Sequence, residues 1–129
     1  MRETISTNKA PAALGPYSQA VKVSGGSLLF CSGQIALDPK TGEIVGETAA
    51  DQCRQVMENL KAVIEAAGAD LSAVVKTTIF LADISDFGQV NEVYAGYFES
   101  DPPARATAES SHLPRGAKVE IDAVAVLKS

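Results

Sequence analysis

Apolar and polar positions alternate along most of the chain, and two longer stretches instead repeat their apolar residues at helical spacing. The alternation predicts strands over residues 3–6, 18–23, 28–35, 74–82, 104–111 and 118–127. The helical spacing predicts helices over residues 48–68 and 86–98. The predicted order is therefore β β β α β α β β, an α+β fold in which residues 1–129 form a single domain.

Both helices carry boundary signals. Thr48 with Asp51 three residues later predicts a capping box, and Gly68 predicts the end of the first helix. Asp86 is expected to cap the second helix, with Gln89 at its third position. The first helix is expected to bury one face, formed by Cys53, Val56, Met57, Leu60, Val63, Ile64 and Ala67. The second is expected to bury the face formed by Phe87, Val90, Val93, Tyr94, Tyr97 and Phe98.

Two short connections look like hairpin turns. Ser24-Gly25-Gly26 predicts a hairpin between the second and third strands. The loop around Pro114 and Gly116 predicts a second hairpin, with residues 104–111 antiparallel to residues 118–127. That pairing would bring Arg105 close to Glu120.

The strands over 28–35, 74–82 and 119–127 are apolar on both faces. Two amphipathic helices can cover only one face of a sheet. The other face must be buried by something else, and the simplest solution is a closed homo-oligomer whose sheets pack face to face. Arg105 and Glu120 would then lie at a seam between subunits.

Arg105 and Glu120 each have an ordinary alternative. A lone Arg at the start of a strand is usually a solvated surface group, and Glu most often points outward. Glu120, however, belongs to a face of its strand that begins charged and becomes apolar, which favours a position between a buried surface and a pocket. Spacing alone leaves both interpretations open.

The chemistry-bearing residues are few. Cys31 and Cys53 lack metal-ligand spacing and lie within apolar patterns, so we expect buried free thiols. The single histidine, His112, lies in a polar loop without a neighbouring Cys or second His. We therefore expect neither a metal site nor a His-based catalytic triad.

The net charge of −5 is spread over the chain without a basic stripe, which argues against a nucleic-acid partner. No apolar run reaches the length of a membrane span, and Met1-Arg2-Glu3 does not begin a secretory signal. We predict a cytoplasmic protein without a membrane partner.

Several segments together resemble a known family, the Rid proteins (reactive intermediate deaminases, also called the YjgF family). The resemblance spans nearly the whole chain in the family's order. It rests on Ala10-Pro11 through Gly15-Pro16-Tyr17-Ser18-Gln19-Ala20, on Ser32-Gly33-Gln34-Ile35, on Val74-Val75-Lys76-Thr77-Thr78, on Val90-Asn91-Glu92-Val93-Tyr94, and on Pro103-Ala104-Arg105 with Val119-Glu120-Ile121.

The resemblance implies a chorismate-mutase-like fold, with two helices on one face of a mixed sheet and a homotrimer whose sheets form an inner barrel. It implies three pockets between neighbouring subunits. The implied activity needs no cofactor and hydrolyses 2-imino acids such as 2-iminobutanoate and 2-iminopropanoate, and their enamine tautomers, to 2-oxo acids and ammonia. Pyridoxal-phosphate enzymes such as threonine or serine dehydratase release these imines.

The resemblance also implies roles for individual residues. Arg105 would clamp the substrate carboxylate, and Glu120 would position or activate the attacking water. Tyr17, expected from the adjacent subunit, would close the pocket. The remaining substrate-binding positions are Ser32, Gly33, Asn91 and Thr107, of which Asn91 is read as a supporting residue; an ordinary helix amide is the alternative for it.

Three positions depart from the family's pattern. Thr107 stands where many members carry Cys, Pro102 stands where an aromatic is common, and Ala108 replaces a bulkier aliphatic. Loss of the thiol argues against thiol-based redox or chaperone roles at position 107. Two other functions remain open: a non-catalytic sensor of small carboxylates, and, disfavoured by the acidic charge and lone His, a ribonuclease or translation inhibitor.

Overall fold

The computed structural model of the protein describes residues 1–128, and its elements follow the predicted order. The strands are β1 (Arg2–Ile5), β2 (Ala20–Val23), β3 (Ser27–Gln34), β4 (Val74–Leu81), β5 (Ala104–Glu109) and β6 (Val119–Leu127). The helices are α1 (Ala49–Ala66) and α2 (Phe87–Tyr97), with single 3-10 turns at Leu71–Ala73, Ile84–Asp86 and Pro114–Gly116. No helix in this described part of the chain is long and apolar enough to cross a membrane.

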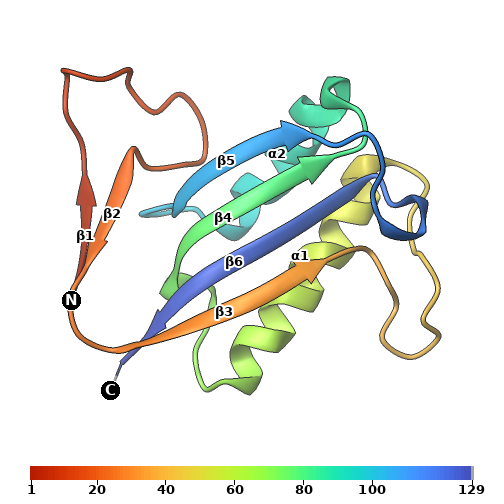
Figure 1. The fold of residues 1–129 in the computed structure, drawn as a ribbon, viewed down its shortest axis with the longest axis horizontal. Coiled ribbons are helices and arrows are strands. Elements are labelled where there is room, and N and C mark those ends of the chain that lie inside the picture. The colour runs from red at the N-terminus through yellow and green to blue at the C-terminus, as the bar shows by residue number, and fades with distance from the viewer. Residues whose placement is uncertain (129) are drawn as a thin grey trace.

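The predicted α+β architecture is confirmed. Strands β3, β6, β4 and β5 form a mixed sheet in that order, and both helices lie on one face of it (Figure 1). β6 runs antiparallel to β3 and β4, whereas β4 and β5 are parallel. β1 and β2 pair separately as an antiparallel hairpin.

The predicted hairpin between β5 and β6 is wrong. β6 lies between β3 and β4, and β5 is at the edge of the sheet beside β4. α2 connects β4 to β5, and a strand that follows a helical crossover lands parallel to the strand before it. β6, which is apolar along most of both faces, takes the central position instead.

The predicted hairpin at Ser24-Gly25-Gly26 is also wrong, because β2 pairs with β1 and β3 pairs with β6. Gly25 and Gly26 have φ of +76° and +82°, so they turn the chain away from β2 instead of folding β3 back onto it. Gly26 also lies against the end of β6, where an added Cβ would be 2.4 Å from the Leu127 carbonyl oxygen.

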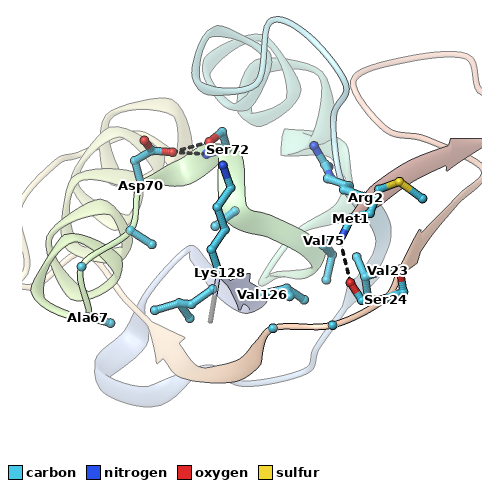
Figure 2. Close-up of a pocket in the computed structure, with 16 residues that line it drawn as sticks. Met1, Arg2, Val23, Ser24, Ala67, Asp70, Ser72, Val75, Val126 and Lys128 are labelled. Carbon is cyan, nitrogen blue, oxygen red and sulfur yellow. Dashed lines mark hydrogen bonds between the residues drawn. The ribbon is translucent and has the colours of Figure 1, made fainter.

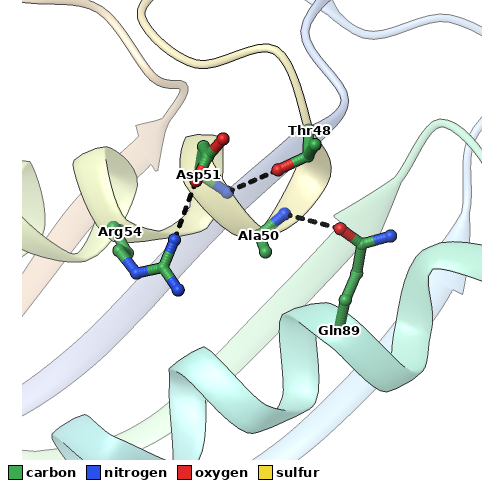
Figure 3. A network of polar contacts seen from close by, with 5 residues as sticks. All are labelled: Thr48, Ala50, Asp51, Arg54 and Gln89. Carbon is green, nitrogen blue, oxygen red and sulfur yellow. Dashed lines mark hydrogen bonds and ion pairs between the residues drawn. The ribbon is translucent and has the colours of Figure 1, made fainter.

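α1 begins where its cap predicts. Thr48 Oγ1 accepts a hydrogen bond from the Asp51 backbone N–H at 3.1 Å. The Asp51 carboxylate pairs with Arg54 at 2.8 Å, so Asp51 joins the cap only through its backbone. Gln89 of α2 adds a second cap, because its Oε1 accepts from the Ala50 N–H at 3.1 Å (Figure 3). This contact ties α2 to the start of α1.

The prediction that the Asp86 side chain caps α2 is wrong. Within residues 1–128, the Asp86 side chain makes no capping bond to the backbone of α2. Its Oδ1 instead accepts from Gln89 Nε2 at 3.1 Å. A 3-10 turn, Ile84–Asp86, runs directly into α2, so Asp86 already has helical backbone angles rather than the extended angles of a capping residue.

The core lies between the sheet and the helices. α1 buries Cys53, Val56, Met57, Leu60 and Ile64, and the sheet buries chiefly Ile79, Leu81, Val119, Ile121, Ala123 and Ala125. Val63 and Ala67 were predicted on the same stripe but are exposed, Val63 by 40%. Val63 lies at the edge of the helix face that the buried residues of α1 form. Ala67 follows Ala66, the last residue of α1.

The sheet face opposite the helices is apolar and uncovered in a single chain. Leu28 and Phe30 of β3 are 60% and 73% exposed. The residues of β4 and β6 that alternate with the core positions continue this face and are half-buried: Thr78, Phe80, Val124 and Val126. The sequence thus predicted a second apolar face correctly, and we call it the open face.

Candidate functional site

Arg105, the second residue of β5, points toward α2 and is surrounded by aromatic rings. Its Nη1 donates a hydrogen bond to Asn91 Oδ1 at 2.6 Å. Its Cζ lies over the rings of Tyr17, Phe87 and Tyr94, at 5.3, 5.4 and 5.2 Å from their centroids. These separations are within the range of cation–π contacts. We call Arg105 with these four residues the arginine group.

The Arg105 guanidinium has no carboxylate partner within residues 1–128, where the one ion pair joins Arg54 to Asp51. It is half-buried, and burial lowers its pKa from the ordinary value while Tyr94 and Tyr17 act in the opposite direction. A partly desolvated cation without a counterion attracts an anion strongly. The planar guanidinium matches a carboxylate in particular, because it can donate two parallel hydrogen bonds.

Tyr17 reaches Arg105 from the loop between β1 and β2. Ser18 fixes this loop to the start of β5, because its backbone N–H donates to the Pro103 carbonyl at 3.2 Å and its Oγ donates to the Pro102 carbonyl. Tyr17 was expected to act from an adjacent subunit. The structure instead places it over Arg105 of its own chain.

Thr107 follows Arg105 on the same face of β5, opposite Ile79 of β4. Its Oγ1 is fully buried and has no hydrogen-bond partner among residues 1–128. An unsatisfied buried hydroxyl costs about 1 to 3 kcal/mol. The Thr107 hydroxyl is therefore a buried polar group left without a hydrogen bond on the same face of β5 as Arg105.

Glu120 lies with Gly33 and Ser32 in a second cluster, which we call the carboxylate group. Gly33 occupies an irregularity of β3, between the pairs Cys31–Ala123 and Gln34–Ile121. A Cβ added to Gly33 would lie 2.2 Å from Glu120 Oε2. Glycine is therefore what allows the carboxylate to lie against the backbone of β3. Ser32, next to Gly33, is exposed.

The two groups lie on opposite faces of the sheet. Arg105 pairs with Thr77 of β4, whose side chain is buried beneath α2. Glu120 pairs with Phe80, whose side chain belongs to the open face. The predicted proximity of Arg105 and Glu120 through a hairpin is therefore wrong, since one chain holds them on either side of β4.

A cavity of about 660 Å³ lies elsewhere, between the two chain ends (Figure 2). Met1, Arg2 and Ser24 lie on one side of it, and Asp70 and Ser72 lie on the other. Polar groups around it are largely paired with one another: the N-terminal ammonium donates to the Ser24 carbonyl at 2.6 Å, and Asp70 accepts from the Ser72 N–H at 2.9 Å. None of the predicted site residues lines it.

Phe87 and Tyr94 were predicted only as core residues, and their contact with Arg105 was missed. The signal was present in the sequence, because Phe87, Asn91 and Tyr94 follow i, i+4, i+7 spacing and share one face of α2. No cluster of His, Cys, Asp and Glu suited to a metal ion occurs within residues 1–128.

The profile of the family described as Endoribonuclease L-PSP matches residues 7–127. The chain belongs to this family. It is 58% identical over 125 residues to Protein DfrA of Myxococcus xanthus, covering 97% of this chain and 95% of that protein. It is 50% identical over 126 residues to the 2-iminobutanoate/2-iminopropanoate deaminase of Mus musculus, covering 98% and 92%.

Solved structures agree with this assignment. RidA from the Antarctic bacterium Psychrobacter sp. PAMC 21119 is 45% identical, with a TM-score of 0.75 over 97% of this chain and 99% of that one. E. coli TdcF with bound serine is 41% identical, with a TM-score of 0.73 over 96% and 98%. The predicted resemblance to Rid proteins is confirmed, and with it the predicted fold class.

Proposed function

We propose that this protein hydrolyses 2-iminobutanoate, 2-iminopropanoate and their enamine tautomers to 2-oxo acids and ammonia. The observation that carries the proposal is the half-buried Arg105 guanidinium, which lacks a carboxylate partner within residues 1–128 and keeps donors free. The name of the mouse relative supports the same chemistry. The imines would come from pyridoxal-phosphate enzymes such as threonine dehydratase.

Arg105 binds the substrate carboxylate. A guanidinium has five N–H donors, and Asn91 takes one of them at 2.6 Å. The remaining donors include pairs that can hold both carboxylate oxygens. Tyr17 covers the bound acid, and the unpaired Thr107 hydroxyl lies on the same face of β5 as Arg105.

Glu120 activates the water. The protonated imine carbon is already electrophilic, so attack requires a positioned water and a base rather than a cofactor. Oxygen bonds to the imine carbon, the C=N π electrons move to nitrogen, and Glu120 takes one water proton. Glu120 returns that proton to nitrogen, and the C–N bond breaks as the C=O bond forms. The proton of the former hydroxyl passes to the departing ammonia, directly or through Glu120, so the products are a 2-oxo acid and ammonium. Gly33 lies beside the carboxylate, and Ser32 precedes it in the chain.

A homotrimer would join the two groups. The arginine group and the carboxylate group lie on opposite faces of one sheet. Each chain would therefore contribute its arginine group to one shared site and its carboxylate group to another. A cyclic assembly with edge strand β5 of one subunit against the open face of the next would bury Phe30 and Leu28 and bring Glu120 of one subunit toward Arg105 of its neighbour. Cyclic closure of three chains gives three equivalent sites.

A carboxylate sensor is the second candidate. One chain alone assembles the complete arginine group, so it can bind a small carboxylate without Glu120. Ribonuclease activity, which the family's description names, is disfavoured because the net charge is −5 and His112 is an exposed loop residue.

The deciding experiment generates the imines in situ with threonine dehydratase or an amino-acid oxidase and follows release of ammonia and 2-oxo acid. The wild type is expected to accelerate release over spontaneous hydrolysis. Arg105→Ala should lose 2-oxo acid binding and turnover together, by about 2 to 4 kcal/mol. Glu120→Gln should keep binding and lose roughly 100-fold in turnover. Wild-type binding without acceleration would establish the sensor.

A further inference from the structure

The arginine group includes two aromatic residues, Phe87 and Tyr94, to which the proposed function gives no role in binding the substrate. Phe87 and Tyr94 present their rings to the guanidinium, and Asn91 between them on α2 accepts a hydrogen bond from Arg105 Nη1. We propose that Phe87, Tyr94 and Thr77 are positioning residues that hold Arg105 in its carboxylate-binding orientation before substrate arrives. This inference deepens the proposed function and rests on it for the identity of the ligand.

Thr77 fixes the Tyr94 ring from the sheet. The Thr77 Oγ1 and Tyr94 hydroxyl are 2.7 Å apart, and both side chains are buried. Thr77 is also the direct neighbour of Arg105 in the register of β4 with β5. Thr77 thus contacts both the strand that carries Arg105 and the Tyr94 ring. The ring cannot turn away from Arg105 without breaking a buried hydrogen bond.

The hydroxyl pair stays intact over the physiological range. Burial raises the pKa of Tyr94 to about 12, although the Thr77 hydrogen bond and Arg105 act in the opposite direction. Tyr94 is consequently a neutral hydroxyl at neutral pH, and its ring retains the face that attracts a cation. Tyr94 therefore serves Arg105 as an aromatic surface and not as a counterion.

Three rings and one amide restrict a side chain that is otherwise long and flexible. Free Arg samples many rotamers, and binding a ligand would have to select one of them. Rings over the guanidinium exclude some of these rotamers, while the amide of Asn91 occupies only one donor. Ordering the arginine in advance raises affinity by lowering the entropy lost on binding.

Core packing is the competing explanation, because Tyr94 also packs on Phe98 with ring centroids 4.9 Å apart. Matched substitutions separate the two roles. Tyr94→Phe and Thr77→Val keep the shape and remove the hydroxyl pair. Phe87→Leu keeps an apolar side chain and removes a ring, whereas Phe87→Tyr restores the ring. Tyr97→Phe is the control, since Tyr97 lies on α2 but its hydroxyl donates to Glu58 at 2.7 Å.

Three readouts are taken for each folded variant: the Kd for 2-oxobutanoate, kcat and KM for imine hydrolysis, and the NMR shift of the ¹⁵N-labelled Arg105 Nε–H. Phe87→Leu and Thr77→Val are expected to raise Kd and KM roughly 3- to 10-fold with kcat little changed. They should also move the Arg105 resonance as the ring currents change. Phe87→Tyr should restore most of the affinity, and Tyr97→Phe should alter none of these quantities.

The outcomes distinguish this inference from the proposed function. Unchanged Kd, KM and Arg105 shift in folded Phe87→Leu and Thr77→Val would overturn the positioning role, whatever the wild type catalyses. A wild type that binds 2-oxobutanoate without hydrolysing imines, and whose variants bind it more weakly, supports the positioning role and removes the deaminase. A wild type that does neither overturns both.

Discussion

Gly33 and Glu120 are in contact across β3 and β6: a Cβ on Gly33 would lie 2.2 Å from Glu120 Oε2 and 3.0 Å from its Cδ. The atoms in the way are the end of a flexible side chain, so Gly33→Ala should fold and displace the carboxylate. We expect turnover to fall at least 10-fold, approaching the loss in Glu120→Gln, with little change in 2-oxo acid affinity. Steady-state kinetics and calorimetric binding measure the two effects.

Gly96→Ala is the matched control for that substitution. Gly96 lies in α2, and nothing lies within 4 Å of an added Cβ. Replacing glycine by alanine in a helix should stabilise the fold by up to about 1 kcal/mol and leave activity unchanged. If Gly33→Ala matches the wild type in turnover, the carboxylate does not act from the position beside Gly33.

Asn91→Asp tests the electrostatics of Arg105. The Asn91 Oδ1 lies 2.6 Å from Arg105 Nη1, so a carboxylate there would form an ion pair with the guanidinium. Its charge would offset the attraction for a substrate carboxylate, and we expect affinity for a 2-oxo acid to fall 10-fold or more. Asn91→Ala should weaken binding less, because it removes a hydrogen bond without adding charge. Equal or tighter binding by Asn91→Asp would contradict the assignment of Arg105 as the anion site.

Phe30→Asp tests the open face. Phe30 is 73% exposed in one chain, and burying a charge in its place within an assembly would be strongly unfavourable. We expect the wild type to sediment as a trimer at micromolar concentration and Phe30→Asp to dissociate. Val63→Asp is the control, because Val63 is 40% exposed on α1, which lies on the sheet face opposite the open face, and the substitution should leave the assembly intact. A wild type that sediments as a folded monomer would remove the assembly argument.

The order of elements and the core could be predicted from the sequence because they depend on local periodicity. The i, i+3, i+4 spacing of α1 and the alternation of β6 survive in the structure with small changes at their ends. Strand pairing depends on non-local contacts, and it was predicted wrongly where a glycine-rich turn or a proline loop looked like a hairpin.

The candidate site shows the same division. Tyr17, Asn91 and Arg105 come together, and so do Gly33 and Glu120. Periodicity could not show that these two clusters lie on opposite faces of the sheet, because their placement depends on β4 lying between β5 and β6. The resemblance to the Rid family identified these site residues but not their positions relative to one another. It gave no site role to Phe87 or Tyr94, since apolar residues on a helix face are normally core residues.

The two thiols should be inert in the native protein. Burial raises the pKa of Cys53 to about 12, and burial followed by the charge of Asp122 raises the pKa of Cys31. Because the thiolate is the reactive form, iodoacetamide at pH 8 should label them about 100-fold more slowly than in denaturant. Mass spectrometry gives the rates. Rapid native labelling accompanied by loss of activity would make one of them functional.

The same thiols predict a stability change in alkali. A thiol whose folded pKa is raised stabilises the fold fully below its unfolded pKa of about 8.5. That contribution is lost as pH rises toward about 12, the pKa of folded Cys53. Denaturant midpoints should therefore fall between pH 9 and 11, and Cys53→Ala should flatten the decline, apart from its general cost to packing.

Mixing two inactive variants tests whether a site is shared between subunits. Arg105→Ala keeps an intact carboxylate group, and Glu120→Gln keeps an intact arginine group. If Arg105 of one subunit works with Glu120 of its neighbour, random heterotrimers regain wild-type sites at about one quarter of their interfaces. Co-refolded or co-expressed variants should then recover about a quarter of wild-type activity, while the same variants mixed as preformed trimers should stay inactive. A site confined to one subunit could gain nothing from mixing, because every subunit carries one of the two substitutions. Failure of verified heterotrimers to recover activity would therefore rule out the shared site.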